Sequence, residues 1–431
     1  MAMNPKKIVR VVLPGSSVKT AEETYRKSRI KALQMRYGYP ARDLRIIAVT
    51  GTNGKTTTCA FINEMLKSAG YRTAMFTTAA VEVDGEHDLN KRHTTVPVTA
   101  ELLSFFKDAQ DKEVDYVVLE VTSHALHQHK LLDIPIEVAV MTNLSQDHLD
   151  YHGTMDEYAA MKARLFNSYL KPTYCVLNHD DPRYTYYEKQ SIGLVDSYGT
   201  NRGCSVQFKD VRTTTDGSRF TLASEGETVG TRIRLAGEFN IYNAVAAATV
   251  GKVLGLSLKQ IAKGVETLNG VAGRMQSIEA GQNFTVFVDY AVTPDAIEQA
   301  LLSLKQRTKG KVHIVFGATG NRDKDKRPKM GKAAAQHADF IYLTDDETYT
   351  EDAAEIRAQV MKGIKAAKGK SKTQEIGDRK KAIQAALKAA KKGDIVYITG
   401  IGHQDSRNMG GNLEPWNEAE VITKLLKNNK K

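Results

Sequence analysis

Residues 44–57 read LRIIAVTGTNGKTT, and this stretch decides the fold of the first half of the chain. Residues 44–50 are apolar enough to form a buried strand, and residues 55–69 have the pattern of a helix. The glycine-containing turn between them places backbone N–H groups at a helix start, where the helix dipole attracts phosphate oxygens. We predict a phosphate-binding loop formed by Gly51, Thr52, Asn53, Gly54, Lys55, Thr56 and Thr57.

Lys55 and Thr56 have the chemistry that ATP requires of such a loop. The lysine can reach the terminal phosphates, and the threonine hydroxyl can bind Mg²⁺. The loop departs from the general pattern GxxxxGK[ST], because Val49 occupies the position of the first glycine. A glycine-rich turn with a chance lysine is the competing interpretation. The strand before the loop and the helix after it favour ATP binding.

Short apolar runs alternate with longer helical patterns through the rest of the chain. Further strands are expected at residues 73–77, 114–121, 137–142 and 173–177. This βαβ order predicts a mostly parallel sheet covered by helices. Threonine-rich alternation over residues 212–234 predicts an antiparallel flap or small subsheet, and residues 241–254 and 258–268 are expected to be helices.

A second βα series follows the glycine-rich residues 270–273, with strands expected at residues 285–288, 312–316, 340–344 and 395–399. The predicted protein is therefore of the α/β class. Residues 1–43 form a short extension with a polar helix, and residues 44–272 form a central P-loop ATPase domain. Residues 273–431 form a smaller Rossmann-like α/β domain.

Composition excludes several classes of protein. The 431 residues are 41% hydrophobic and 26% charged, as is typical of globular domains. No apolar run approaches the ~20 residues that span a bilayer, so a cytoplasmic protein without a membrane partner is expected. The net charge of +11 would suit anionic molecules, but no aromatics interleave the lysines, which argues against nucleic acid. The three scattered cysteines fit neither a zinc site nor a disulfide framework.

Two strand ends carry groups that could complete a nucleotide site. A Mg²⁺ ion held by the Thr56 hydroxyl needs a carboxylate at the end of a neighbouring strand. Glu120 lies near the end of the apolar run DYVVLEV, although an acid at the edge of a sheet is an equally good interpretation of it alone. His148 follows the next apolar run, where a structural histidine would be the ordinary expectation.

Several segments together resemble the Mur ligases, the ATP-dependent amide-forming enzymes of peptidoglycan precursor synthesis. The resemblance is to the type that adds the third peptide residue to UDP-N-acetylmuramoyl-L-Ala-D-Glu. It covers residues 44–405. The matching segments are TGTNGKTT (50–57), EVTSHAL (120–126), TNLSQDHLDYHGTMDEY (142–158), AGEFNIYNAVAA (236–247), GRMQ (273–276), VDYAVTPDAI (288–297) and GATGNRDKDKRPKMG (317–331).

The resemblance implies a reaction and a set of roles. ATP phosphorylates a substrate carboxylate, and an amine attacks the resulting acyl phosphate. Lys55 and Thr56 would hold the phosphates and a first Mg²⁺ with Glu120, and His148 would bind a second Mg²⁺. Lys162 matches a lysine that family members convert to N6-carboxylysine. The remaining implied contacts are Asn240 and Asn243 near the adenine, Arg274 at the phosphates and Asp289 at the ribose.

The substrate-contact positions match the family less closely. Family members carry an N-terminal domain that grips UDP, and the segment before Leu44 is expected to be too short for it. Thr94 and Thr95 resemble an element that contacts the muramoyl-peptide, as do Thr122 and Ser123. Lys130 stands where arginine is usual, which keeps the charge but loses the bidentate fork. Val292 replaces a histidine in YAVTP.

The amino-acid pocket differs most from that of diaminopimelate-adding members. Those show DNPR where this chain has Asp346-Glu347-Thr348-Tyr349, and GKGHE where it has Gly400-Ile401-Gly402-His403-Gln404. Glu347 could receive a cationic side chain such as that of lysine or ornithine, or could merely cap the following helix. The substrate-binding candidates at this end are Asp346, Glu347, Gly402 and Gln404.

The leading hypothesis is thus an ATP-dependent ligase that acts on a muramoyl-peptide and an amino acid. A folylpolyglutamate-synthetase-like ligase is one alternative, and a non-catalytic ATP-binding scaffold of a cell-wall complex is another. The retention of Lys55, Glu120, His148 and Lys162 favours catalysis over the scaffold. The amino acid added, the oligomeric state and the recognition of UDP stay open.

Overall fold

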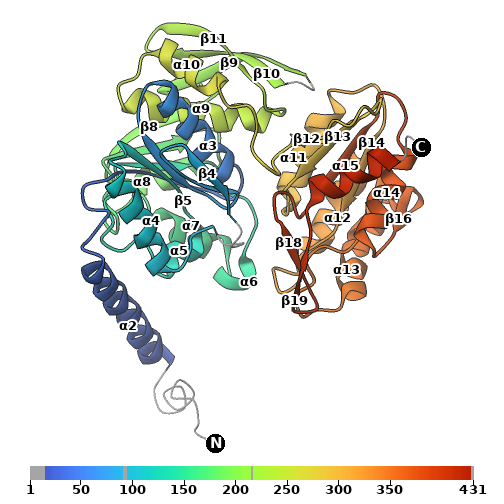
Figure 1. The fold of residues 1–431 in the computed structure, drawn as a ribbon, viewed down its shortest axis with the longest axis horizontal. Coiled ribbons are helices and arrows are strands. Elements are labelled where there is room, and N and C mark those ends of the chain that lie inside the picture. Colours follow the sequence, from blue (N-terminus) through green and yellow to red (C-terminus); the bar gives the residue numbers. More distant parts are fainter. Residues whose placement is uncertain (1–14, 91–94, 215–216, 429–431) are drawn as a thin grey trace, which may run out of the picture.

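The computed structural model describes residues 15–90, 95–214 and 217–428 and contains two large sheets, each covered by helices (Figure 1). The first sheet is 11-stranded, with the order β11-β10-β9-β8-β7-β6-β1-β5-β2-β3-β4. The second is 6-stranded, with the order β12-β13-β17-β14-β15-β16. The α/β fold class is confirmed. The boundary predicted between residues 272 and 273 falls between α10 (Leu258–Glu266) and β12 (Gln276–Ser277).

The middle of the first sheet is parallel, as its apolar strands require. Its strands are β2 (Thr73–Phe76), β5 (Tyr116–Glu120), β1 (Arg45–Thr50), β6 (Val138–Met141), β7 (Tyr174–Asn178) and β8 (Leu194–Gly199). Parallel sheets are covered on both faces, and successive side chains of a strand point to opposite faces. Ile47 and Val49 accordingly belong to one buried cluster, and Ile46 and Ala48 to another.

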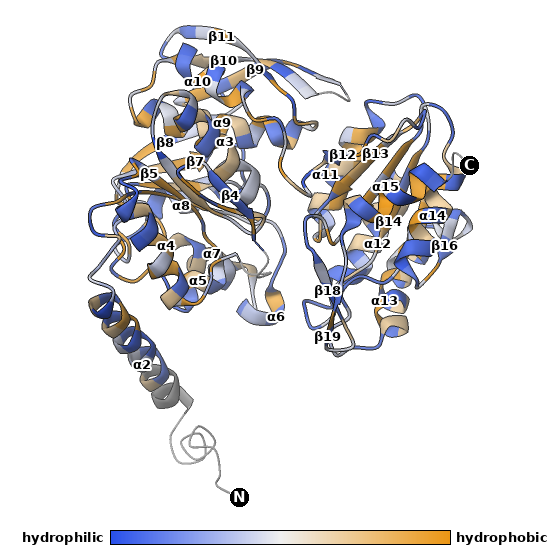
Figure 2. Ribbon diagram, in the orientation of Figure 1, coloured by the Kyte–Doolittle hydropathy of each residue, from blue (hydrophilic) through white to orange (hydrophobic). Residues whose placement is uncertain are grey.

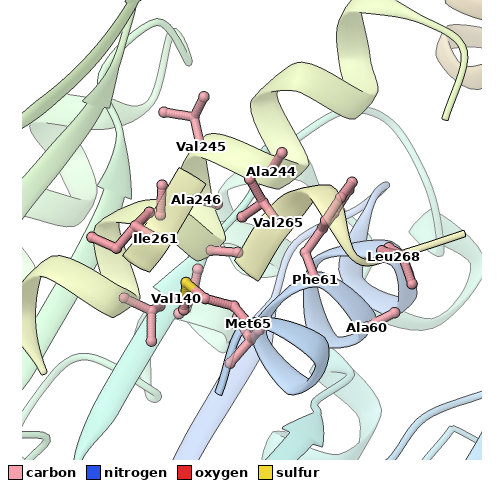
Figure 3. Close-up of a cluster of buried hydrophobic side chains, with 14 of the residues drawn as sticks. Ala60, Phe61, Met65, Val140, Ala244, Val245, Ala246, Ile261, Val265 and Leu268 are labelled. Carbon is pink, nitrogen blue, oxygen red and sulfur yellow. The ribbon is translucent and has the colours of Figure 1, made fainter. Parts of the chain in front are cut away.

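Different helices cover the two faces. The cluster that contains Ile47 includes residues of α3 (Lys55–Ser68), α9 (Glu238–Val253) and α10. Figure 3 shows Phe61 and Met65 of α3 beside Ile261 and Val265 of α10. Here the helices pack closely, because a Cβ on Gly264 would lie 2.8 Å from the Cα of Met65. The opposite face holds α4 (Thr99–Asp111), α5 (Ser123–His127), α7 (Met155–Ala163) and α8 (Tyr184–Gln190).

Antiparallel strands extend the first sheet at both edges. β9 (Val206–Thr214), β10 (Gly217–Ser224) and β11 (Glu227–Ile233) form the antiparallel segment that the alternation predicted. It is not a separate subsheet, because β9 pairs in parallel with β8. At the other edge, β3 (Ala80–Val83) and β4 (Glu86–Leu89) add a hairpin that the sequence analysis did not predict.

The second sheet is parallel except for β12. Its other strands are β13 (Thr285–Asp289), β17 (Ile395–Thr399), β14 (Val312–Phe316), β15 (Phe340–Leu343) and β16 (Thr373–Glu375). α11 (Pro294–Lys305), α12 (Lys326–His337) and α13 (Ala353–Ala366) cover one face, and α14 (Arg379–Ala389) and α15 (Glu418–Asn428) cover the other. Hydrophobic residues concentrate on the strands, and the surrounding helices carry hydrophilic stretches (Figure 2).

Two helices and a two-stranded hairpin also belong to the fold. α2 (Gly15–Arg36) extends away from the first sheet, and its C-terminal part is attached through Leu33, which packs against the cluster of α4, and through Gln34, which donates to the Leu132 carbonyl (Figure 1). α6 (Leu149–His152) is a short helix after β6, and β18 (Ser406–Met409) pairs with β19 (Asn412–Pro415) as a hairpin. No helix in the described part of the chain is long and apolar enough to cross a bilayer.

Candidate active site

A cleft of about 1100 Å³ lies between the carboxyl ends of strands from both sheets. Residues at or just after the ends of β5, β6, β13 and β17 line it, represented by Glu120, Thr142, Asp289 and Gly400. Ligands of open α/β sheets bind at such carboxyl ends. The arrangement follows from the parallel pairing of β1 with β5 and β6, which brings distant residues to one edge.

The predicted phosphate-binding loop lies on the floor of this cleft. Gly54 caps α3 in the left-handed region with φ 81°, and a Cβ there would lie 2.2 Å from the Oδ1 of Asn243. The backbone N–H of Asn53 donates to Asn143 Oδ1 at 3.0 Å, and Thr142 Oγ1 donates to the Asn53 carbonyl at 2.7 Å. The segment after β6 thus fixes the loop, and the first residues of α3 line the cleft.

Thr56 and Glu120 lie together, as the strand-end argument predicted. Thr56 Oγ1 donates to Glu120 Oε2 at 2.8 Å, and the same oxygen accepts the backbone N–H of Thr78. A hydroxyl and one carboxylate beside a phosphate loop fit Mg²⁺, which keeps several waters and takes its other ligands from phosphate oxygens. Among the described residues no group of three or more His, Cys, Asp or Glu could hold a metal alone. A metal ion at this site would therefore need phosphate oxygens of the nucleotide as further ligands.

Two cations reach the phosphate loop, one from each half of the cleft. Lys55 donates to the Thr52 carbonyl at 2.8 Å, and burial lowers the pKa of its ammonium group. Arg274, from the segment before β12, donates to Thr56 Oγ1 at 3.0 Å, and its guanidinium lies 4.7 Å from the Tyr290 ring centroid. Phosphate oxygens entering the loop would therefore meet positive charge from both sheets.

His148 is the N-cap residue of α6, in the segment that follows β6, and lies beside a buried ion pair. Burial lowers the pKa of His148 to about 3, so its imidazole is neutral. Its Nε2 lies 3.3 Å from Asp147 Oδ2, and Asp147 Oδ1 accepts from Lys326 Nζ at 3.0 Å. Lys326 comes from α12 of the second sheet, so this buried pair joins the two halves of the cleft.

Lys162 lies beneath the phosphate loop rather than on the surface of the cleft. The side chain is 1% exposed, and its Nζ donates to the Gly51 carbonyl at 2.6 Å. Burial, together with nearby Lys55, lowers the pKa of Lys162 well below its usual range. Tyr158 covers the amine, with 4.5 Å between Nζ and the ring centroid. Gly51 and Lys162 are absent from the cleft lining.

The other predicted nucleotide contacts reach the cleft from two directions. Asn240 and Asn243, on α9, line it and are joined by a 3.1 Å hydrogen bond. Asp289, at the end of β13, accepts from the Tyr397 hydroxyl at 2.7 Å and from the Tyr290 N–H at 2.8 Å. Burial raises the pKa of its carboxyl.

The predicted muramoyl-peptide contacts are only partly brought together. Thr95, Thr122 and Lys130 line the cleft, and Lys130 donates to the Val96 carbonyl at 2.7 Å. The Ser123 hydroxyl is buried against His152 Nε2 at 2.8 Å and does not line it. Thr94 lies outside the described residues.

The candidates for the amino-acid end divide in the same way. Glu347 and Gln404 line the cleft, whereas Asp346 and Gly402 do not. Asp346 is buried behind Glu347, and burial raises the pKa of Asp346 to about 6. The interpretation of Glu347 as the cap of the next helix is wrong, because α13 begins after Asp352, whose side chain accepts the Glu355 N–H.

Comparison with known proteins agrees with this geometry. Residues 49–251 match the Mur ligase middle domain, and residues 273–402 match the Mur ligase glutamate ligase domain. The UDP-N-acetylmuramoyl-L-alanyl-D-glutamate--2,6-diaminopimelate ligase of Geobacillus kaustophilus (strain HTA426) is 38% identical over 397 residues, which are 91% of this chain and 80% of that protein. The chain belongs to the Mur ligase family.

Two solved structures extend the comparison of this Mur ligase. A UDP-N-acetylmuramoyl-L-alanyl-D-glutamate--2,6-diaminopimelate ligase matches with a TM-score of 0.63 and 33% identity over 93% of this chain and 82% of that one. A Mycobacterium tuberculosis folylpolyglutamate synthase complexed with ADP and AMPPCP matches with a TM-score of 0.71 at 20% identity, over 86% and 92%. At that identity the second likeness concerns the fold alone. Mur ligases are ATP-dependent, Mg²⁺-requiring enzymes that form amide bonds between muramoyl-peptides and amino acids.

The sequence analysis missed several residues of this Mur ligase cleft. Asp147 and Lys326 both lie in quoted motifs, but they are 179 residues apart and nothing in the sequence pairs them. Asp295 accepts from Asn53 Nδ2 at 2.9 Å and forms another bridge between the two halves. Arg322 lies with its guanidinium 5.1 Å from the Tyr349 ring centroid, and both residues line the cleft.

Proposed function

We propose that this Mur ligase adds the third amino acid to UDP-N-acetylmuramoyl-L-alanyl-D-glutamate through an acyl phosphate. The observation that carries the proposal is the meeting of Thr56, Glu120 and Arg274 at the phosphate loop. The relatives of known substrate specificity supply the substrate class, because the Geobacillus protein is named as the ligase of that dipeptide. The two lines of support are independent of each other.

The proposed reaction has two steps. A carboxylate oxygen of the substrate attacks the γ-phosphorus of ATP, and ADP leaves with the electron pair of the broken P–O bond. The amine of the amino acid then attacks the acyl carbon, and inorganic phosphate leaves as the amide forms and the amine loses a proton. Both steps gather negative charge, which Lys55 and Arg274 are placed to stabilise.

Magnesium would be held by the Thr56 hydroxyl and the Glu120 carboxylate, with a second ion near His148 and Lys162. The metal supplies charge neutralisation at the phosphates. Thr56 and Glu120 fit it because hydroxyl and carboxylate oxygens suit a hard cation. The neutral imidazole of His148 has a free lone pair to offer, although its Nε2 now faces Asp147.

We infer that Lys162 is the site of N6-carboxylysine. An amine with a lowered pKa is uncharged and nucleophilic, so it can add to CO₂ to give a carbamate and release one proton. The carbamate would accept hydrogen bonds, whereas the amine now donates one to the Gly51 carbonyl. Carbamylation therefore requires this side chain to turn toward the metal side of the loop.

Contacts between the two sheets support the exclusion of water during the reaction. Arg274 with Thr56, Asp295 with Asn53 and Lys326 with Asp147 all join the halves at the cleft. An acyl phosphate is hydrolysed readily, so a closed site protects it until the amine arrives.

The test combines substrate activation with a variant. With ATP, Mg²⁺ and UDP-N-acetylmuramoyl-L-Ala-D-Glu but no amino acid, hydroxylamine should trap the acyl phosphate as a hydroxamate that mass spectrometry detects. The same dipeptide without UDP measures the contribution of the nucleotide sugar. A folate substrate tests the folylpolyglutamate-synthetase-like alternative. Trapping with folate and not with the dipeptide would contradict the proposal.

The variant Lys162→Ala tests the role of that residue. Amide formation should fall by about 100-fold or more, while ATP binding survives because Lys162 does not line the cleft. Intact-protein mass spectrometry under CO₂ should show one added CO₂ on the wild type only. Turnover equal to that of the wild type would contradict the proposed role.

A further inference from the structure

Glu347 is a buried carboxylate that faces the cleft without a cationic partner. It is 7% exposed and lines the cavity. Its Oε1 accepts the Asn408 N–H at 3.1 Å, and its Oε2 accepts from Gln404 Nε2 at 3.4 Å. Among the residues that the structure describes, no lysine, arginine or histidine forms an ion pair with it. Burying an anion without a counter-charge costs free energy, so a cationic group of a ligand would lower that cost by pairing with Glu347.

Gln404 adds a second acceptor beside this carboxylate. Its Oε1 is buried and has no hydrogen-bond partner within the described part of the chain. The orientation of the amide is fixed by chemistry, because only the NH₂ end can donate to the Glu347 carboxylate. Glu347 therefore has two neutral donors but no counter-charge, and the neighbouring Gln404 Oε1 has no donor among the described residues. An ammonium group, with three donors and one positive charge, matches both of them.

Two arginines in this part of the molecule have other partners. Arg379 is fully buried and pairs with Glu418 at 2.5 Å, and its NH2 also donates to the Thr399 carbonyl. Arg322 lies across the Tyr349 ring, with its guanidinium 5.1 Å from the ring centroid. Because Arg322 lines the cleft and its ring contact leaves its charge unpaired among the described residues, it could bind the α-carboxylate that every amino acid carries. Glu347 would then bind the end of the side chain.

The backbone holds Glu347 in this orientation. The Gly320 N–H donates to the Glu347 carbonyl at 2.7 Å, and the Gly410 N–H donates to Thr348 Oγ1 at 3.0 Å. The Tyr349 N–H donates to the Asn408 carbonyl at 3.2 Å. The β18–β19 hairpin and the turn at Gly320 thus both hydrogen-bond to the segment that carries Glu347. The carboxylate is therefore held in place before any ligand binds.

We propose that the amino acid added by this Mur ligase has a side chain that ends in an ammonium group without a second carboxylate, as lysine and ornithine have. The proposal rests on the proposed function and names its amine substrate. A diaminopimelate side chain would bring a second carboxylate toward Glu347, and no described basic side chain contacts that carboxylate. Repulsion between that second carboxylate and Glu347 would oppose the binding of diaminopimelate.

The experiment compares four amine substrates with the full chain. L-lysine, L-ornithine, meso-diaminopimelate and L-norleucine, which is lysine without its ammonium group, are each supplied with ATP, Mg²⁺ and UDP-N-acetylmuramoyl-L-Ala-D-Glu. We expect kcat/KM for lysine or ornithine to exceed that for the other two by about 100-fold. Equal or better use of diaminopimelate or norleucine would overturn the inference.

The variant Glu347→Gln locates the preference in one side chain. We expect it to raise KM for the preferred amine by about 100-fold with a much smaller change in kcat, and to abolish the preference over norleucine. Glu355→Gln, at an exposed glutamate of α13, is the matched control and should leave both constants unchanged. An unchanged KM in Glu347→Gln would overturn the inference, and if that variant does not fold, the wild-type comparison decides.

The hydroxamate assay separates the two failures. If the wild-type protein activates the dipeptide and then shows no preference for a cationic side chain, the inference alone fails. If no hydroxamate forms, the proposed function fails and the inference falls with it.

Discussion

The two ends of the cleft differ in how completely their charges are satisfied. At the nucleotide end, Arg274 donates to the Thr56 hydroxyl, which in turn donates to Glu120. Lys55 donates to the carbonyl of Thr52 in its own loop. At the amino-acid end, Glu347 has no cation and Gln404 Oε1 has no donor among the described residues. The side chains of the nucleotide end are thus largely joined to one another, with Arg274 Nε still without a partner among the described residues, whereas the proposed ligand would supply the cation that Glu347 lacks.

The difference follows from how each end is built. The phosphate loop is seven consecutive residues fixed by one strand, one helix and the neighbouring end of β6. The amino-acid end is assembled from separate segments around Arg322, Glu347, Gln404 and Asn408. A contiguous site tolerates little change, whereas a site assembled from loops can change its specificity without altering the fold.

The largest effect should come from breaking the nucleotide end. Lys55→Ala should lower the rate of phosphate release by about 1000-fold, because the loop loses its own cation beside the transferring phosphoryl group. Lys107→Ala, at an exposed lysine of α4 paired with Asp111, is the control and should change the rate little. A rate within a few-fold of the wild type would show that Arg274 alone supplies enough positive charge beside the transferring phosphoryl group.

The buried ion pair between the halves should matter more than a surface pair. Asp147→Asn leaves the Lys326 ammonium buried without its partner, since the two side chains are 9% and 5% exposed. We expect the free energy of unfolding in urea to fall by about 3 kcal/mol. Glu420→Gln breaks an exposed pair with Lys424 and should cost about 0.5 kcal/mol or less. Equal losses in the two variants would contradict the importance of the pair.

Acid should destabilise the protein through the histidines around His148. Burial lowers the pKa of His124 to about 4, of His148 to about 3 and of His152 to about 4. Between pH 6.5 and 4 the unfolded chain binds protons at these sites and the native protein does not, so stability rises with pH over this window. The free energy of unfolding should be lower at pH 4.5 than at pH 7 by about 2 kcal/mol for each of the three histidines. A flat profile would contradict the burial argument.

The smallest effect concerns the helix that carries Lys162. Thr154 begins α7 with a capping box, in which its Oγ1 accepts the Glu157 N–H at 3.2 Å. Thr154→Ala should lower stability by about 1 kcal/mol. Ser257→Ala removes the equivalent box of α10 and should lower stability equally. Activity should fall only in the Thr154 variant, because α7 carries Lys162, whose Nζ donates to the phosphate loop, whereas α10 carries no residue of the proposed site.

Local features of this molecule were predictable, and contacts distant in sequence were not. The pairing of Thr56 with Glu120 followed from the rule that parallel strands end at one edge of a sheet. The pairing of Asp147 with Lys326 had no such rule, because it depends on how two sheets face each other. The β18–β19 hairpin was missed because its short strands, SRNM and NLEP, lack apolar alternation. Without that hairpin, the position of Glu347 could be read as a helix cap.

The hydrogen bond from the β18–β19 hairpin to Glu347 affects how the amino-acid specificity of this enzyme can change in evolution. The bond comes from the main-chain N–H of Asn408, which every residue except proline possesses. The tip and β19, residues 410–415, are exposed and pack into neither sheet. Mutations there should disturb folding little, and they can act on the amino-acid end only through the segment of Asn408 that holds Glu347, because residues 410–415 do not line the cleft. Proline at position 408 is the substitution that drift should avoid.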